Sequence, residues 1–563
     1  MHGFSSCFRL LSAKQKRDYF IVTGLATLSA LTDMIGMASI IPVISTLVDY
    51  DNSVKKGYLV TLYQFVGQPE KGQFLVILTL CAVALVWISG LTTMLSLFAS
   101  RRFFKRVNAD ISARVYRTYM LEPIEKFYAK PSSEFLRNVN GVSERVASGV
   151  FGASTIIVSR TVQIVVIIAL LLYVNTFVTG VIVAVIGAAY LVIYWGVKPK
   201  IVKIAAENFA ESKVIQQLAI GSYQGYRGIT IDGQLKQFSS RFNALKKEVL
   251  RKAANMEIIG AIPRNIIEIT GITMLIAASY FIGESSRSSQ HFVFVMGLFA
   301  VAAYKILPAA QQLYNAFNRI TAALVVYIDV KRDWGDLSPS PPSRGDGFDV
   351  GNCSVIEVRG LSYSIGAKCI LKEISMKIEL EGVIRIAGPS GVGKSTFLEL
   401  LAGLRRPQAG EIFLDEKPMA SVNLPSWWSR ISYLSQGAYL FEGNLRENIV
   451  LSETSVDQER LSKVADICGL QSLGEPNEFD PEFTVAENGS NLSGGQKSRV
   501  LLARALYKDT DTVFLDEAFS ALDVDAAKAI IEEVQTSFPE RCVIVVSHRN
   551  AELPGNVTEY VIG

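Results

Sequence analysis

The stretch VIRIAGPSGVGKSTFLELLAGL, residues 383–404, decides the fold of the second half of the chain. A β-branched run enters a glycine-rich turn that opens an apolar run with helical spacing. The turn fits GxxxxGK[ST], in which backbone N–H groups wrap nucleotide phosphates, Lys394 neutralises the terminal phosphates and the Ser395 hydroxyl ligates Mg²⁺. The predicted phosphate-binding residues are Gly388, Pro389, Ser390, Gly391, Val392, Gly393, Lys394, Ser395 and Thr396.

Other β-rich runs alternate with helical stretches through residues 351–563, which predicts an α/β P-loop NTPase domain. The run TVFLDE ends in Asp516 and Glu517. We expect Asp516 to hold the Mg²⁺ shell and Glu517 to orient or deprotonate the attacking water. Residues 333–350 contain three prolines without apolar periodicity and are predicted to be a linker.

Residues 1–332 differ in composition and are predicted to form a membrane domain. The chain has 563 residues, of which 50% are apolar and 19% charged, whereas soluble domains average about 25% charged. Residues 1–344 carry a net charge of +16 and residues 345–563 one of −12. This division favours a membrane domain joined to a cytoplasmic domain over a nucleic-acid-binding protein, and the composition excludes disorder and collagen.

Six apolar stretches are long enough to cross a bilayer, which takes about 20 helical residues. They lie near 20–48, 73–100, 150–174, 177–197, 256–284 and 292–316. Ten Lys and Arg residues lie in 101–145 and eleven in 198–252, so the positive-inside rule places these loops and both termini in the cytoplasm. The N-terminus is too polar for a signal peptide. We expect a multi-pass protein of the cell (inner) membrane.

The cytoplasmic loops have helical periodicity, so their helices are predicted to continue past the membrane. A break at Pro131–Ser133, with Ser as N-cap, and another around Gly221–Gly228 predict a short transverse helix at each tip. On the outer side, residues 57–67 fit a helix in the headgroup layer or an ordinary packed loop helix.

Ionisable residues inside spans are costly and mark functional sites. We note Asp33, Arg264, Glu268 and Lys305. Arg264 and Lys305 fall at similar depth and predict a cation-lined substrate cavity. The alternatives are an Arg264–Glu268 pair at i,i+4 and a Lys305 side chain that snorkels to the interface. Six scattered cysteines show no disulfide or zinc spacing.

The segment NLSGGQ, Asn491–Gln496, precedes the TVFLDE strand, and at this point the chain resembles the ATP-binding cassette (ABC) transporter family. Gln436 resembles the family's Q-loop, SALD at Ser520–Asp523 its D-loop and His548 its switch histidine. The resemblance implies ATP and Mg²⁺ as cofactors. It gives Glu517, His548 and Gln436 catalytic roles, Gln436 also a metal contact, and ATP contacts to Ser493, Gly494, Gly495, Gln496 and Asp523.

In this family the signature of one cassette faces the ATP bound to a second cassette. The resemblance therefore implies a homodimer with twelve spans, and a heterodimer is the alternative. The family's adenine-stacking aromatic falls here on Ile365, with Tyr363 two residues earlier. Either Tyr363 has taken over the stacking or an aliphatic contact replaces it.

The membrane half resembles six-span exporters of the family, and more closely the bacterial lipid-linked oligosaccharide flippases. TDMIGMASIIPVI, GYLVTLYQF, IPRNIIEITG and AAYKILPAAQQL carry the closer resemblance, in which Arg264 and Lys305 match basic cavity positions. It implies an ATP-driven flippase for an amphipathic anionic substrate such as a polyprenyl-pyrophosphate-linked oligosaccharide. A peptide or multidrug exporter is an alternative. An ATP-gated channel or regulatory membrane subunit is another, against which the retained Glu517 and His548 argue.

Overall fold

The computed structural model describes residues 2–562 except 49, 51–53, 55–58, 286–288, 335–346, 452–454, 474–477 and 547–556. The chain divides into two compact units. The first consists of Met1–Glu122 and Phe127–Pro341, and the second of Pro123–Lys126 and Pro342–Gly563. The later boundary falls within the stretch expected to be a linker.

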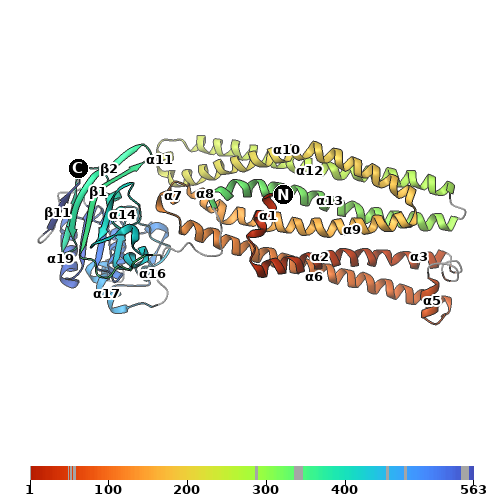
Figure 1. Ribbon diagram of the computed structural model, residues 1–563, viewed down its shortest axis with the longest axis horizontal. Coiled ribbons are helices and arrows are strands. Elements are labelled where there is room, and N and C mark those ends of the chain that lie inside the picture. The colour runs from red at the N-terminus through yellow and green to blue at the C-terminus, as the bar shows by residue number, and fades with distance from the viewer. Residues whose placement is uncertain are drawn as a thin grey trace. The chain divides into compact units, whose positions relative to one another are not determined.

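Helices make up the described part of the chain before the linker (Figure 1). They are α1 (His2–Arg9), α2 (Ala13–Ala38), α3 (Ile40–Val48), α5 (Val60–Phe65), α6 (Lys71–Met120), α7 (Ile124–Tyr128), α8 (Ser132–Leu136), the π-helical segments η1 (Arg137–Val142) and η2 (Arg145–Gly152), α9 (Ala153–Val174), α10 (Thr176–Gln224), α11 (Tyr226–Ile231), α12 (Leu235–Ser285) and α13 (Ser289–Trp334).

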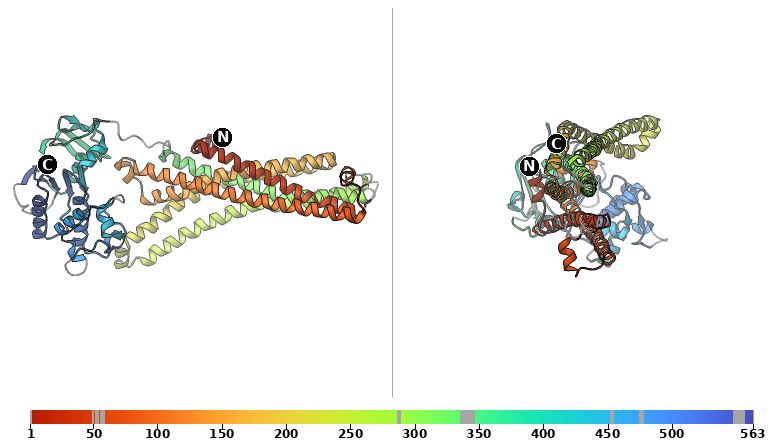
Figure 2. Two further views of the ribbon diagram at one scale, coloured as in Figure 1. Left: turned by 90° about the horizontal axis from the view of Figure 1, so that it is seen from below. Right: turned by 90° about the vertical axis from the view of Figure 1, so that its right-hand side faces the viewer.

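The long helices of the first unit run beside one another, with α2 along α6, α9 along α13 and α10 along α12 (Figure 2). Their polar side chains pair between helices. The Tyr19 and Ser154 hydroxyls are 2.7 Å apart, and those of Thr32 and Thr92 are also 2.7 Å apart. Large apolar side chains such as Trp87, which is 70% exposed, face outward from α6. Such an outward apolar surface suits lipid.

Within the described residues, three helical runs are long and apolar enough to cross a membrane: Ala13–Leu47, Lys71–Met120 and Ser132–Val174. The continuation of helices beyond a bilayer thickness is confirmed by α6 and α10, which have 50 and 49 residues. The first predicted span is interrupted at Ser39, between α2 and α3. The fourth, fifth and sixth spans stay predictions as membrane crossings.

The two predicted helix breaks are present, but one cap differs. The break near Gly221–Gly228 is confirmed, because Gly225 ends α10 and α11 follows it. The predicted serine N-cap at the other break is wrong. Pro131 is the N-cap of α8, and no side chain caps the helix, because Ser132 and Ser133 already lie inside it. On the outer side, α5 covers part of the expected helix, and Tyr58 lies outside the described residues.

The second unit has a parallel sheet in the order β11-β3-β10-β9-β6, an antiparallel sheet β2-β1-β4-β5 and a pair β7-β8. The strands are β1 (Val355–Ile365), β2 (Lys368–Glu379), β3 (Val383–Ala387), β4 (Ala409–Leu414), β5 (Lys417–Pro418), β6 (Ile431–Leu434), β7 (Gly443–Asn444), β8 (Thr484–Val485), β9 (Thr512–Asp516), β10 (Cys542–Val546) and β11 (Val557–Val561). The predicted α/β class is confirmed.

Helices and buried side chains complete this unit. The helices are α14 (Lys394–Leu401), α15 (Leu424–Arg430), α16 (Leu445–Val450), α17 (Gln458–Ile467), α18 (Gly494–Tyr507) and α19 (Val524–Ser537), with 3-10 turns η3 (Met419–Ser421), η4 (Leu470–Leu473) and η5 (Glu487–Gly489). Strands β3, β9 and β10 are fully buried or nearly so, as both faces of a covered parallel sheet must be. Their carboxyl ends meet at one edge, where ligands bind in such sheets.

Candidate functional site

The glycine-rich turn between β3 and α14 has a backbone that only glycine accommodates. Gly393 is the N-cap of α14 with φ +101°, and a Cβ there would lie 2.6 Å from Ile370 Cγ2. A Cβ on Gly388 would lie 2.3 Å from the Ile562 carbonyl oxygen. These positions let the loop turn sharply and direct its N–H groups inward, as phosphate binding requires.

Lys394 is buried beneath this loop. Its Nζ donates hydrogen bonds to the carbonyl oxygens of Gly388, at 2.8 Å, and Pro389, at 2.9 Å. Burial lowers the pKa of the amine, and the negative charges of Glu517 and Asp516 oppose that shift. The ammonium group is therefore placed inside the loop, where it can neutralise a phosphate.

Two residues predicted to hold Mg²⁺ are in direct contact. The Ser395 hydroxyl at the start of α14 donates to Asp516 Oδ1 at the end of β9, at 2.9 Å. Asp516 is only 3% exposed. Hydroxyl and carboxylate oxygens are the ligands that Mg²⁺ prefers, so the residues present fit this ion.

Glu517 and Gln436 form the second contact of the site. Gln436 Nε2 donates to Glu517 Oε2 at 2.6 Å. Glu517 has φ +54°, and its backbone N–H donates to the Val546 carbonyl at 3.0 Å, which anchors it beside β10. The structure thus joins Ser395 to Asp516 and Gln436 to Glu517. His548 lies outside the described residues.

The signature segment forms the exposed start of α18. Ser493 is its N-cap and exchanges hydrogen bonds with Gln496, from Ser493 N to Gln496 Oε1 at 2.9 Å and from Gln496 N to Ser493 Oγ at 3.2 Å. Asp523 caps α19 by accepting from Ala526 N at 2.7 Å. Both side chains therefore shape helix ends, and their ATP contacts stay predictions.

The two candidates for adenine stacking differ in exposure. Tyr363 is 4% exposed, and its hydroxyl accepts a hydrogen bond from Arg405 Nη1 at 2.9 Å. Ile365 is 50% exposed. The tyrosine ring belongs to the buried core, so Ile365 is the one whose side chain a base can reach.

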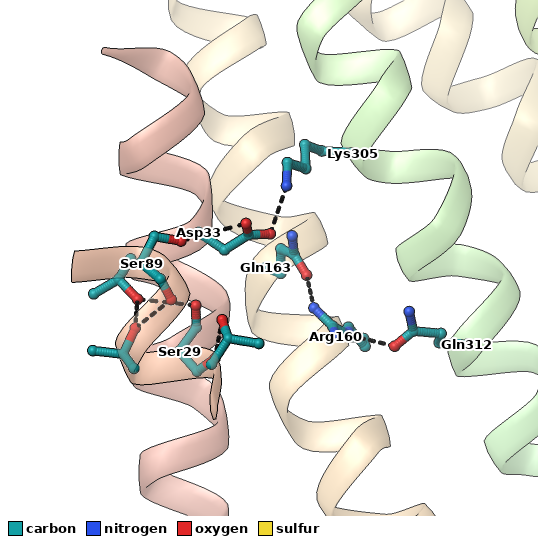
Figure 3. A network of polar contacts seen from close by, with 10 residues as sticks. Ser29, Asp33, Ser89, Arg160, Gln163, Lys305 and Gln312 are labelled. Carbon is teal, nitrogen blue, oxygen red and sulfur yellow. Dashed lines mark hydrogen bonds and ion pairs between the residues drawn. The ribbon is translucent and has the colours of Figure 1, made fainter. Parts of the chain in front are cut away.

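A polar cluster lies among the apolar helices of the first unit (Figure 3). Lys305 on α13 donates to Asp33 on α2 with an Nζ–Oδ2 distance of 2.6 Å. The Ser89 hydroxyl on α6 reaches Asp33 Oδ1 at 3.5 Å. Lys305, predicted to line a substrate cavity, is thus part of an ion pair that the sequence analysis did not assign.

Arg160 on α9 lies beside this pair (Figure 3) and was missed by the sequence analysis. Its Nε donates to Gln312 Oε1 at 2.8 Å and its Nη1 to Gln163 Oε1 at 2.6 Å. It is the one arginine in the apolar run ASTIIVSRTVQIVVIIALLLYV, so the search for charges inside spans, applied to span three, would have found it. The side chain of Arg264 lies outside the described part of the structure.

Comparisons with known proteins agree with this architecture. The family described as "ABC transporter transmembrane region" matches residues 19–303, just over half of the chain, and the family "ABC transporter" matches 371–520. The ATP-dependent lipid A-core flippase of Xylella fastidiosa (strain 9a5c) is 26% identical over 495 residues, which cover 84% of this chain and 80% of that protein.

Two further comparisons concern one part of the chain and its whole fold. The mycobactin import ATP-binding/permease protein IrtB of Mycolicibacterium smegmatis is 30% identical over 249 residues, covering 44% of this chain and 41% of that one. A bacterial Atm1-family ABC exporter with ATP bound has the same fold, with a TM-score of 0.78, 17% identity and coverage of 98% of this chain and 93% of that chain. The protein therefore belongs to the ABC transporter family, as an exporter-type half-transporter whose cassette hydrolyses ATP to drive transport.

Proposed function

We propose that this protein is a homodimeric flippase that moves an amphipathic anionic lipid, a polyprenyl-pyrophosphate-linked oligosaccharide, to the outer leaflet. The observation that carries this proposal is the charge of the polar cluster among the membrane helices. Asp33 and Lys305 neutralise each other, whereas the guanidinium of Arg160 is held by two neutral amides.

The surplus of positive charge follows from the partners of Arg160. Among the described residues, no carboxylate lies within ion-pair distance of its guanidinium. Gln163 and Gln312 occupy its Nη1 and Nε and fix the group without neutralising it. A guanidinium binds phosphate oxygens through paired N–H groups, so a headgroup with anionic phosphates is the cargo that this cluster suits. A cationic peptide would be repelled.

The relatives support a lipid cargo. The Xylella fastidiosa protein is named as a lipid A-core flippase, and it aligns with most of this chain. A lipid with a polar anionic headgroup is a cargo of the same kind. We further propose that the protein lies in the inner membrane with both termini and the cassette in the cytoplasm, as the distribution of Lys and Arg between the loops supports.

The observed contacts of the cassette residues suggest how each of them would act in binding and hydrolysing ATP. Ser395 and Asp516 would hold Mg²⁺, which when bound neutralises charge on the β- and γ-phosphates. Glu517 would accept the proton of the attacking water, and its bond to Gln436 holds the carboxylate in place. Ser493, Gly494 and Gly495 would present the start of α18 to ATP on the partner cassette, which makes two copies necessary.

The test uses the purified protein in vesicles that contain a fluorescent polyprenyl-pyrophosphate-linked glycan. When ATP is added outside, wild-type copies whose cassettes face outward should move the glycan to the inner leaflet of the vesicle and so protect it from outside reagents. Arg160→Gln should slow this by about tenfold or more, the loss of one charge-assisted contact, while ATP hydrolysis continues. Arg160→Lys keeps the charge, so its rate of flipping should lie between the rates of wild type and Arg160→Gln. Arg106→Gln, an exposed arginine on α6, is the matched control.

Three outcomes would overturn the proposal. Flipping by Arg160→Gln at the wild-type rate would show that the cluster does not handle the headgroup. Wild-type transport of a peptide, with no movement of the glycolipid, would replace the flippase by the peptide exporter. ATP hydrolysis without transport of any cargo would favour a regulatory subunit.

A further inference from the structure

A pocket of about 470 Å³ opens in the first unit, apart from both sites described above. It lies where the π-helical segments η1 and η2 face α10. Its walls include Ser133, Arg137, Gly141, Arg145 and Phe209. All of them belong to the loops expected in the cytoplasm. Segments of π-helix are rare and often mark functional sites.

Two arginines meet over one aromatic ring in this pocket. The Cζ atom of Arg137 lies 4.5 Å from the centre of the Phe209 ring, and that of Arg145 lies 5.7 Å from it. Arg137 donates only to the neutral amide of Asn138, through Nε and Nη2, both at 3.3 Å. Among the described residues, neither arginine has a carboxylate partner.

The surroundings compensate this positive charge only in part, through the attraction between Arg137 and Glu134. Loss of solvent around Arg145 lowers the pKa of its guanidinium, and repulsion by Arg137 lowers it further. Two acids of this region are already paired with lysines: Glu134 with Lys213, with Oε2 and Nζ 2.8 Å apart, and Glu144 with Lys105, with Oε1 and Nζ 2.9 Å apart. Two like charges are therefore held together at an energetic cost, which an anion would relieve.

A serine hydroxyl in the wall also has no partner. Ser133 is 4% exposed, and its Oγ makes no hydrogen bond. A buried hydroxyl without a partner costs about 1–3 kcal/mol, a cost that a hydrogen bond to a bound ligand would relieve. Elsewhere in the pocket wall, a Cβ on Gly141 would meet no atom within 4 Å, so the space is open.

We propose that this pocket binds the phosphoryl group of a small phosphate ester, with Arg137 and Arg145 pairing with its oxygens and the Ser133 hydroxyl donating to it. Two guanidinium groups match the two charges of a phosphate monoester better than the single charge of a carboxylate. The remaining volume and the apolar side chains of Leu136 and Ile220 accommodate the body of the ester. The site is additional to the transport cluster and does not rest on its cargo.

The experiment uses the full-length protein in nanodiscs of phosphatidylcholine, with inorganic pyrophosphate as the probe. Amide hydrogen exchange is followed on peptides that cover 132–152 and 206–222. Exchange should slow by about fivefold when the probe is at about four times its dissociation constant. Peptides across the phosphate loop, 388–396, report binding to the cassette separately in the same sample.

Three variants make the test specific. Arg137→Gln/Arg145→Gln should lose the protection of the pocket peptides but keep that of the phosphate loop. Gly141→Leu fills the open space while both arginines remain, and it should also lose protection; leucine is the better helix former, so folding is favoured. The control Arg106→Gln/Arg251→Gln removes the same charge from exposed sites outside the pocket and should behave as wild type.

A second arm separates the two sources of a phosphoryl group. Nanodiscs with phosphatidic acid as a minority lipid are compared with pure phosphatidylcholine, without pyrophosphate. If only phosphatidic acid slows exchange, the ligand is a lipid headgroup. If only pyrophosphate slows exchange, the ligand is a soluble ester. Either result supports the site. Absence of protection in both arms, or protection that persists in Arg137→Gln/Arg145→Gln, overturns it.

Discussion

The cassette site and the membrane polar cluster both gather charge, but they are built in opposite ways. In the cassette, Lys394 and Ser395 are neighbours in sequence, as are Asp516 and Glu517, and one sheet edge brings the two pairs together. In the membrane unit, Asp33 and Lys305 are 272 positions apart and come from α2 and α13. A site shaped by a loop can be recognised in the sequence, whereas for a site shaped by helix packing the sequence marks the charged residues but not how they pair.

The largest expected effect tests the cassette side of this comparison. Glu517→Gln should lower steady-state ATP hydrolysis by about 10²–10⁴-fold, because the amide cannot accept the proton of the attacking water. ATP binding should persist, since the phosphate loop is unchanged, and the dimer should be trapped closed. Hydrolysis and retention of labelled ATP are measured on the same preparation.

The control for this change is Glu532→Gln, the same exchange at an exposed position on α19. It should hydrolyse ATP as wild type does. Hydrolysis by Glu517→Gln near the wild-type rate would remove the proposed role of this carboxylate.

The next effect tests the membrane side. Lys305→Met should lower the free energy of unfolding by about 3 kcal/mol, because Asp33 keeps a charge among apolar helices without its partner. The double variant Asp33→Asn/Lys305→Met should recover most of this loss. Thermal unfolding in detergent, read from tryptophan fluorescence, provides the comparison.

Lys331→Met removes an exposed lysine from the same helix and serves as the control. Equal melting temperatures for Lys305→Met and Lys331→Met would mean that the ion pair does not stabilise the bundle. The cluster would then need another structural explanation.

A smaller effect concerns the core beneath the nucleotide. Tyr363→Phe should cost about 1.5 kcal/mol of cassette stability, because Arg405 loses a hydrogen-bond acceptor. ATP affinity should stay unchanged, since the ring is buried. Tyr433→Phe is the matched control: the Tyr433 hydroxyl is buried and has no hydrogen-bond partner among the described residues, so its removal should cost nothing. Denaturant titration gives the stabilities, and equal losses in both variants would contradict this account.

The smallest expected effect concerns recognition of the adenine base of ATP. Ile365→Tyr should tighten ATP binding by about 0.5–1.5 kcal/mol relative to nucleotides with other bases, if an aromatic ring at this exposed position stacks on adenine. Ile365→Leu should leave affinity unchanged. Isothermal titration calorimetry measures the nucleotide affinities of wild type, Ile365→Tyr and Ile365→Leu. Unchanged affinity in Ile365→Tyr together with a large loss of ATP affinity in Tyr363→Ala, which removes the ring, would assign the stacking to Tyr363 instead.

Much of the cassette could be predicted because its chemistry depends on local backbone. Glycines at 388 and 393 are required by the positive φ of the loop, which is a local property, and the contacts with Ile562 and Ile370, which are remote in sequence, add to this requirement. The class of the domain follows from the alternation of strand and helix patterns. The contact between Gln436 and Glu517 could not be placed, because it joins segments 81 positions apart.

The sequence alone determined the membrane domain, the phosphate loop and the family, since apolar length, glycine spacing and ordered motifs are properties of a linear chain. The tertiary structure decided which charges are neutralised. Helical packing brought Lys305 to Asp33, left Arg160 with neutral partners, and set Arg137 and Arg145 over Phe209. The physical reason is that electrostatic energy depends on distance in space, and only folding fixes the distances between residues remote in sequence.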